Sequence, residues 1–421
     1  MVAVLGYTHE QIREAVKEMY TIVANRPHTP LHFPTGPDAC SKAHYPEDHL
    51  KDLPAKALES FAGVGCPFTA EVIKPGDTVL DVGSGSGTDV LIAAKLVGKT
   101  GRVIGLDLTP AMRSKLQSLI EEQQIKNVEV LAGDAESIPL PDHSVDVVSS
   151  NGVLNLVADK RKAINEIFRV LKPGGRVQIA DIVIASPVTP DCEDDPKLWA
   201  ECVVGATIDE NYLNMFRDAG FETVEVLRDY DYFSYSPSKE TQEVAKQFGA
   251  HAYELRMTRG AVAPPKIIQF AKRLDPGRIT RDIKRRGIAG MVGLTLALVA
   301  CYGTLAAVAA LGFLGVSLAL NEGIWAGAIV SAALLTTAFV AAGLRKYTSP
   351  LPLILAGTGS LVLIYTMYSQ YSIVTEVIGF VLLGVGTWFD FSLRRWIKVP
   401  GGKAQARIRR RDSHIKTNVS A

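Results

Sequence analysis

The sequence predicts an α/β domain, a mostly parallel sheet with helices on both faces, followed by an all-α region of four membrane-length helices. Two observations support this fold class. Between residues 77 and 260, short β-branched runs alternate with segments of helical periodicity, the pattern of parallel strands joined by crossover helices. Residues 287–321, 323–344 and 347–375 then contain no Asp, Glu, Lys or Arg. Crossing a bilayer takes about 20 apolar residues, and these runs are long enough.

The charge distribution divides the chain at nearly the same place. Residues 1–271 hold 27 Lys+Arg and 38 Asp+Glu, a net charge of −11, whereas residues 272–421 hold 18 and 6, a net charge of +12. A basic half indicates nucleic acid or an anionic membrane face as partner. The apolar runs favour the membrane, and the basic tail shows no aromatic interleaving, so we expect no nucleic-acid partner. The odd number of cysteines, five, favours reduced thiols in a cytosolic soluble part.

The first 60 residues are expected to form an N-terminal helix and a lid segment. Residues 7–24 have amphipathic periodicity, and Thr8 followed by Gln11 matches a capping box. Residues 26–50 are rich in Pro, His and Gly and predict a lid-like loop. The α/β domain itself is placed at residues 61–260.

Within residues 61–260, apolar periodicity predicts the strands and helices in order. The expected strands are 78–82, 102–107, 128–132, 145–149, 176–181, 223–228 and 253–258. The expected helices are 88–97, 110–123, 159–171 and 210–219.

The central motif is the glycine-rich loop Asp81-Val82-Gly83-Ser84-Gly85-Ser86-Gly87, which follows the first strand and opens the first helix. Its glycines permit a sharp turn and close approach of a ligand, which the free N–H groups of the helix start would then face. Asp107 ends the second strand, where an acid can bind two ribose hydroxyls. Asp134 follows the third strand, where a carboxylate can accept a hydrogen bond from an adenine amine. These positions predict a nucleotide-cofactor site.

With the turn Lys172-Pro173-Gly174-Gly175, these motifs resemble the class I S-adenosylmethionine-dependent methyltransferases. The resemblance implies a seven-stranded, Rossmann-like sheet with one antiparallel strand near its edge, and S-adenosylmethionine as cofactor. By the same resemblance, Asp81, Gly83 and Gly85 would hold the methionine part, Asp107 the ribose, and Met112 and Asp134 the adenine, while Asn151 would line the methyl side. Ser84, Gly87, Leu108 and Ala135 complete the cofactor-binding set.

Three flanking segments, residues 60–68, 150–156 and 198–206, are similar to the arsenite methyltransferase family. In that family thiolates bind As(III), a soft centre that prefers sulfur ligands. The resemblance makes Cys66, Cys202 and Asn151 the candidate catalytic residues, with both cysteines as As(III) ligands and Cys40 as a weaker one. Where the family usually has a further cysteine this chain has Gly152, so a trigonal site would need Cys40 or Cys192 as its third ligand.

The C-terminal part is expected to contain a basic linker at 261–287, four transmembrane helices within 288–395 and a basic cytoplasmic tail at 396–421. The spans are placed at 289–311, 323–344, 351–370 and 373–393. The positive-inside rule puts both ends and the α/β domain in the cytoplasm, with anionic lipid at the linker and tail. The region around Cys301 and residues 378–391 resembles, more weakly, the four-helix MerC-type mercury-transport proteins.

Three functions stay open at this stage. The first is a membrane-anchored methyltransferase that acts on As(III) or a similar soft, small-molecule nucleophile. The second is a methyltransferase that acts on a membrane-soluble lipid, quinone or sterol-like substrate. The third is a membrane metal-binding or transport protein with a regulatory methyltransferase-like domain.

Overall fold

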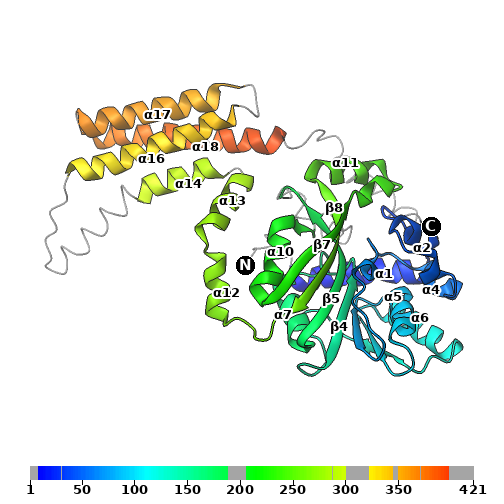
Figure 1. Cartoon of the computed structure of the whole chain (residues 1–421). Coiled ribbons are helices and arrows are strands. Elements are labelled where there is room, and N and C mark those ends of the chain that lie inside the picture. The colour runs from blue at the N-terminus through cyan, green and yellow to red at the C-terminus, as the bar shows by residue number, and fades with distance from the viewer. Residues whose placement is uncertain are drawn as a thin grey trace. The chain divides into compact units, whose positions relative to one another are not determined.

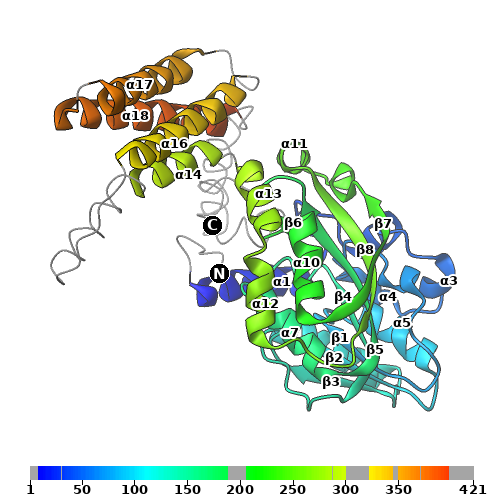
Figure 2. The ribbon, with the colours of Figure 1, turned by 60° about the vertical axis from the view of Figure 1, so that its left-hand side comes forward.

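The computed structural model describes residues 8–29, 31–187, 205–286, 288–299, 322–344, 349–369 and 371–397. The chain divides into two compact units, Met1–Leu274 and Asp275–Ala421. Figure 1 shows the strands in the first unit, and Figure 2 shows the same ribbon turned by 60°.

The first unit is built on a mixed sheet whose main strands follow the order β3-β2-β1-β4-β5-β8-β7. The strands β1 to β5 are parallel to their neighbours, whereas β8 is antiparallel to both β5 and β7. The short β6 pairs with the end of β5. The strands are β1 (Thr78–Val82), β2 (Arg102–Asp107), β3 (Val128–Ala132), β4 (Val145–Asn151), β5 (Leu171–Ile184), β6 (Thr207–Ile208), β7 (Phe221–Tyr230) and β8 (Ala250–Arg259).

Helices cover both faces of this sheet (Figure 1). The helices described in this unit are α1 (His9–Asn25), α2 (Gly36–Lys42), α3 (Glu47–Leu50), α4 (Ala55–Glu59), α5 (Thr88–Val97), α6 (Pro110–Glu122), α7 (Lys160–Val170), α10 (Asp209–Ala219), α11 (Lys239–Phe248) and α12 (Lys266–Arg273), with the 3-10 turns η1 (Pro67–Ala70) and η2 (Tyr232–Tyr235).

The two-residue period of the strands decides which face each side chain enters. Leu80 packs with α7 and α10 in one buried cluster, whereas its neighbour Val79 packs with α5 and α6 in another. Both side chains are fully buried. Because successive strand side chains point to opposite faces, an apolar run such as Val79-Leu80 specifies a strand covered on both sides. The sheet therefore holds the loops at its carboxyl ends on a rigid base.

The predicted seven-stranded sheet with an antiparallel strand next to the edge is confirmed, and β6 adds a short eighth strand. The predicted Lys172–Gly175 turn lies within β5, which begins at Leu171, and Gly174 takes a positive φ of 73° there. The predicted loop at 26–50 contains α2 and α3, because Pro37 and Pro46 stand at their starts, where proline favours a helix. The capping box of Thr8 and Gln11 is present at the start of α1.

The second unit is all-helical over its described residues. It contains α13 (Pro276–Arg286), α14 (Ala289–Leu298), α16 (Glu322–Gly343), α17 (Leu351–Tyr368) and α18 (Ile373–Ile397). Among the described residues, three segments are long and apolar enough to cross a membrane: Ala326–Gly343, Leu351–Tyr368 and Ile373–Leu393. They correspond to the last three predicted spans. The first predicted span, 289–311, lies outside the described residues beyond position 299.

Helices α17 and α18 pack at close range because small residues line their contact. A Cβ added to Gly359 would stand 2.6 Å from the backbone nitrogen of Leu383, and one added to Gly386 would stand 2.6 Å from that of Ala356. Ser360 is buried beside this contact, where its hydroxyl donates to the Ala333 carbonyl of α16 at 3.1 Å. Small residues and such hydrogen bonds hold helices together where apolar burial alone does not distinguish protein from lipid.

Candidate active site

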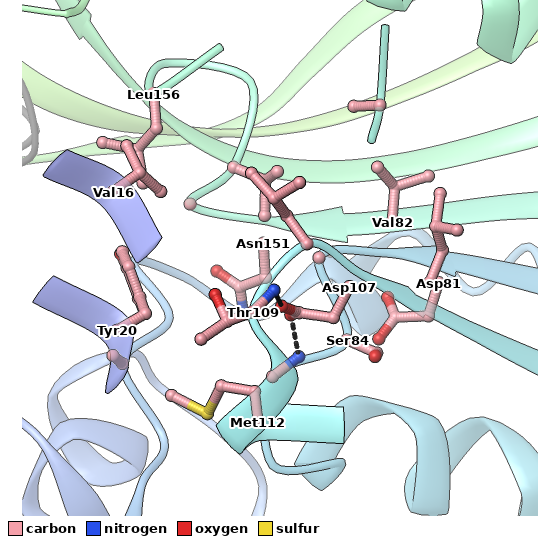
Figure 3. Close-up of a pocket in the computed structure, with 18 of the residues that line it drawn as sticks. Val16, Tyr20, Asp81, Val82, Ser84, Asp107, Thr109, Met112, Asn151 and Leu156 are labelled. Atoms are coloured by element: carbon pink, nitrogen blue, oxygen red, sulfur yellow. Dashed lines mark hydrogen bonds between the residues drawn. The ribbon is translucent and has the colours of Figure 1, made fainter. Parts of the chain in front are cut away.

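The glycine-rich loop between β1 and α5 forms one wall of a pocket with an empty volume of about 1040 Å³, which includes space open to solvent. All 11 residues predicted to bind the cofactor line this pocket, although they come from five separate segments. Figure 3 shows Val16 and Tyr20 of α1 on one side, with Asp81 and Asp107 across from them. The sheet therefore brings together residues that are up to 70 positions apart, Asp81 and Asn151.

The loop keeps its shape through bonds to β2. The backbone nitrogens of Gly83 and Ser84 donate to the Leu106 carbonyl at 2.7 and 3.0 Å. Gly83 and Gly85 have φ values of 76° and 52°, in the left-handed region that favours glycine. A Cβ at Gly83 would overlap the side chain of Val153, whereas nothing lies within 4 Å of the Cβ position of Gly85. The backbone at Gly85 is thus open to the approach of a ligand.

Asp107 is the residue that joins the loop to the end of β2. Its Oδ2 accepts from the Gly85 backbone nitrogen at 2.8 Å and its Oδ1 accepts from the Thr109 nitrogen at 2.7 Å, as the dashed lines in Figure 3 show. Nearby, the buried Ser84 hydroxyl lines the pocket without a hydrogen-bond partner among the described residues. A carboxylate fixed in this way still has lone pairs for ligand hydroxyls, and Ser84 offers a further polar atom.

Three buried carboxyl groups meet at this wall. Burial raises the pKa of Asp81 well above its usual value, and the charges of Asp89 and Asp107 raise it further. Burial also raises the pKa of Asp107, and it raises that of Asp89 to about 6. Acids that repel one another in a low-dielectric site favour a cation as their ligand, because a positive charge stabilises their ionised forms. The pocket is electrostatically suited to a cationic molecule.

On the predicted adenine side, Asp134 is already engaged by the protein. Its Oδ1 accepts from the Glu136 backbone nitrogen at 2.8 Å, and its Oδ2 forms an ion pair with Nε of Arg13 at 2.6 Å. Arg13 also lies 3.5 Å from Glu136. Because Arg13 belongs to α1, this ion pair fastens the helix across the pocket. Asp134 lines the pocket as predicted, and its role towards an adenine stays a prediction.

The Asn151 side chain lines the pocket and also anchors the segment before η1. Its Oδ1 accepts from the Val64 nitrogen at 2.8 Å, and its Nδ2 donates to the Gly65 carbonyl at 2.8 Å and to Asp89 Oδ2 at 3.1 Å. The Tyr45 hydroxyl donates to Asp89 Oδ1 at 2.5 Å. Asn151 thus fixes the backbone next to Cys66 against the start of α5, which makes it a positioning residue in this structure.

The predicted arsenic ligands Cys40 and Cys66 are buried outside the pocket lining, in the same apolar cluster. Burial, together with the charge of Asp89, raises the pKa of each thiol to about 12. The Cys66 backbone nitrogen donates to Glu254 Oε1 at 3.0 Å. No group of three or more metal-binding side chains occurs in the described part of the chain. Cys202, Cys192 and Cys301 lie outside it, so a shared thiolate site stays a prediction.

Gly152, where the arsenite methyltransferase family usually has cysteine, takes a left-handed backbone with φ of 70°. A Cβ there would stand 3.3 Å from Val64 Cγ1, which is tight. The backbone of this chain at position 152 therefore suits glycine and would be strained by a cysteine.

Several lining residues escaped the sequence prediction. Arg13, Val16 and Tyr20 of α1 line the pocket, as does Asp89. The sequence could have predicted Asp89, because it lies in the first turn of the helix that follows the glycine loop. The sequence could not have predicted Arg13, because 121 positions separate it from Asp134 and helical periodicity alone does not pair two such residues.

The residues present fit S-adenosylmethionine. The molecule carries a sulfonium and an ammonium group, which match the three buried acids, and ribose hydroxyls, which match Asp107. The open position at Gly85 and the unpartnered Ser84 hydroxyl leave room and bonding capacity beside them.

Comparison with known proteins identifies the family. Residues 73–220 match the family model described as a methyltransferase domain. The chain is 43% identical over 177 residues to an arsenite methyltransferase of Halobacterium salinarum, covering 42% of this chain and 45% of that protein. It is 32% identical over 178 residues to the ubiquinone/menaquinone biosynthesis C-methyltransferase UbiE of Escherichia coli O1:K1 / APEC, covering 36% and 69%.

Among solved structures, the chain matches the crystal structure of an arsenic(III) S-adenosylmethionine methyltransferase from Chlamydomonas reinhardtii. The two sequences are 28% identical and the TM-score is 0.43, and the match covers 54% of this chain and 75% of that one. The chain spans about half the length of the arsenite methyltransferases that it matches. The family model, the two relatives and the pocket agree: the chain belongs to the S-adenosylmethionine-dependent methyltransferases, and S-adenosylmethionine is its cofactor.

Proposed function

We propose that this chain is a membrane-anchored methyltransferase that transfers a methyl group from S-adenosylmethionine to As(III) or a similar soft acceptor. Sequence similarity to arsenite methyltransferases is the observation that supports As(III) as the acceptor. The enzymes of Halobacterium salinarum and Mus musculus are 43% and 33% identical to this chain over the matched regions. Cys66 and Cys202, the two cysteines that match this family, supply soft ligands of the required kind.

The protein contributes positioning and exclusion of water. The sulfonium methyl of the bound cofactor is already activated, so the acceptor needs to be held in line and close to it. Tyr20 and Val16 of α1 line the pocket opposite the cofactor loop (Figure 3), and the ion pair of Arg13 with Asp134 fastens this helix. Asn151 holds the backbone of residues 64–65, and hence Cys66, against Asp89 at the start of α5. Covering the pocket in this way keeps water from the reacting atoms.

Acceptance of As(III) requires the segment from α2 to η1 to open, because Cys40 and Cys66 are buried. Their proposed partner Cys202 lies on residues 198–206, a segment related by resemblance to the same family. In this proposal Cys66 and Cys202 are the As(III) ligands, with Cys40 as a weaker one.

A membrane-soluble acceptor such as a quinone or other lipid is the second candidate, and specific observations favour it. The left-handed backbone of Gly152 would be strained by a cysteine, and the two described cysteines do not line the pocket. The Escherichia coli relative, of which the chain covers 69%, is named a ubiquinone/menaquinone biosynthesis C-methyltransferase.

The proposed anchor is the C-terminal unit, with the four spans predicted from sequence and with the methyltransferase domain and the tail in the cytoplasm. Three membrane-length helices support the proposal. Arg345-Lys346 and the basic tail flank the spans on the side that the positive-inside rule assigns to the cytoplasm. Protease protection of tags placed at either end, in sealed vesicles of known orientation, tests this arrangement. Metal transport through these helices stays a prediction that rests on the weak resemblance to the MerC-type proteins.

The acceptor is decided by one assay. Purified full-length protein is incubated with S-adenosylmethionine and either arsenite or an extract of membrane lipids, and the products are identified by mass spectrometry. We expect methylated arsenic, lost in Cys66→Ser and Cys202→Ser and kept in Cys301→Ser. Methylated lipid with no methylated arsenic would replace the first acceptor class by the second.

A further inference from the structure

We propose that α12 (Lys266–Arg273) lies in the interface of an anionic membrane, with an apolar stripe inserted among the lipids, and so holds the methyltransferase unit against the bilayer. This inference rests on the membrane anchoring proposed above. It adds a second, peripheral contact made by the first unit itself, separate from the spans of the second.

The stripe consists of Ile267, Phe270 and Leu274, which follow one another at the i, i+3, i+7 spacing of a single helix face. Their side chains are 76%, 57% and 54% exposed. Adjacent Ile268 is 47% exposed. Isolated exposed apolar residues are common on soluble proteins, but four within eight positions form a patch of the kind that contacts a partner.

Contacts elsewhere on α12 hold the helix in place, so the stripe does not need to be buried. α12 contacts α10, and Figures 1 and 2 both show it on the outside of that helix. Gln269 is half-buried, and its Nε2 donates to the Pro264 carbonyl at 3.0 Å, which fixes the start of the helix. Among the described side chains of α12 only Gln269 is half-buried, and the stripe of Ile267, Phe270 and Leu274 is exposed.

Charge favours a membrane as the partner. Residues 266–286 hold eight Lys+Arg and two Asp. An amphipathic helix with basic residues beside an apolar stripe is the pattern of helices that lie in the plane of an anionic membrane surface. Residues 275–288 alone separate Leu274 from the start of α14, which is also the start of the first span predicted from the sequence. A lipid surface is thus within reach of α12 by connectivity.

The test measures lipid contact at Phe270 in the full-length protein. An environment-sensitive fluorescent amino acid is introduced by codon suppression at position 270 or, as a matched control, at Lys272, which leaves the native cysteines unlabelled. The protein is reconstituted in vesicles of phosphatidylcholine, with or without phosphatidylglycerol. A nitroxide on the lipid acyl chains and aqueous iodide serve as quenchers from the two sides.

We expect the label at 270 to be quenched by the acyl-chain nitroxide in phosphatidylglycerol vesicles, and much less in phosphatidylcholine alone or at high salt. The label at 272 should respond to iodide instead. Ile267→Ser with Leu274→Ser should abolish the nitroxide quenching at 270. Val262→Ser, which removes a 79% exposed side chain outside the helix, should leave it unchanged.

Iodide access at 270 in both kinds of vesicle would overturn the inference, and so would protection from both quenchers, which would mean that protein covers the stripe. Alkaline carbonate extraction of the same samples separates this result from failure of the anchoring proposal. If the protein stays in the membrane pellet while iodide quenches the label at position 270, only the proposal of an interfacial helix is refuted. If the protein is released into the supernatant, the membrane anchor is refuted.

Discussion

Asp81, Asp89 and Asp107 give the pocket its chemical character. Each is buried, and burial raises the pKa of each; at Asp81 the charges of Asp89 and Asp107 raise it further. A structural core would avoid such a cluster, because unpaired buried charge costs stability. Its presence at the mouth of the glycine loop is understandable if the ligand supplies the positive charge.

Cofactor binding should therefore release protons. A bound sulfonium and ammonium lower the pKa of Asp81, so the free protein holds a proton that the complex does not, and affinity rises with pH through the interval between the two pKa values. Calorimetric titrations in buffers of different ionisation enthalpy should give different observed heats. Heats that do not depend on the buffer would contradict this coupling.

Cys66 and Cys40 should react slowly with alkylating agents in the folded protein. With a pKa of about 12 for each thiol, only about one thiol in ten thousand is ionised at pH 8, and the thiolate is the reactive form. Peptide mass spectrometry after iodoacetamide treatment should show alkylation that grows about tenfold per pH unit. Rapid alkylation of Cys66 at pH 8, at the rate seen in denatured protein, would show that the segment opens freely.

Gly152→Ala should lower the free energy of unfolding by roughly 1–2 kcal/mol, because alanine is strained in a left-handed backbone. Gly174→Ala is the matched control, since Gly174 has a similar φ of 73° but nothing within 4 Å of its Cβ position. Any excess cost at position 152 then measures the contact with Val64. Thermal unfolding that is unchanged in Gly152→Ala would mean that the site accepts a side chain, and a cysteine at 152 would become feasible.

At the scale of elements, the strands and crossover helices were predictable because each carries its own periodicity. Val79 and Leu80 enter opposite faces of the sheet, so their run was visible in the sequence alone. The helices α2 and α3 were not predicted, because they are short and prolines interrupt the pattern. Neither was α11, which has a polar sequence and buries only Ala245 and Phe248. Propensity is weak evidence for such short elements.

One buried hydrogen-bonded group, formed by Tyr45, Asp89 and Asn151, helps to hold the segment from α2 to η1. Tyr45→Phe removes the donor to Asp89 and should cost roughly 1.5–3 kcal/mol, the range for a hydrogen bond to a charged group. Hydrogen–deuterium exchange should speed up across residues 36–66. Tyr235→Phe, at a 38% exposed position, is the control. Unchanged exchange in Tyr45→Phe would show that the other contacts of the segment hold it without this group.

At the scale of the whole molecule, composition predicted the division into an acidic α/β part and a basic, apolar part, because charge and hydropathy are properties of long stretches. Sequence motifs predicted three parts of the pocket lining: the glycine-rich loop, Asp107 and Asp134. The helix α1, which covers the pocket, was not predicted to do so, because the contact of Arg13 with Asp134 arises only when α1 folds back over the strands. Cys202, on which the acceptor site depends, lies outside the described residues, so its place stays a prediction.

The central claim is that the pocket around Asp107 binds S-adenosylmethionine, and calorimetry on the full-length protein tests it most directly. Wild-type protein should bind the cofactor at one site per chain, and Asp107→Ala should bind it roughly 10- to 100-fold more weakly, since the bonds that shape the loop are lost. Glu225→Ala, at an exposed ion pair on β7, should bind like wild type. Absence of binding heat in the folded wild-type protein, or equal affinity in Asp107→Ala, would contradict the account.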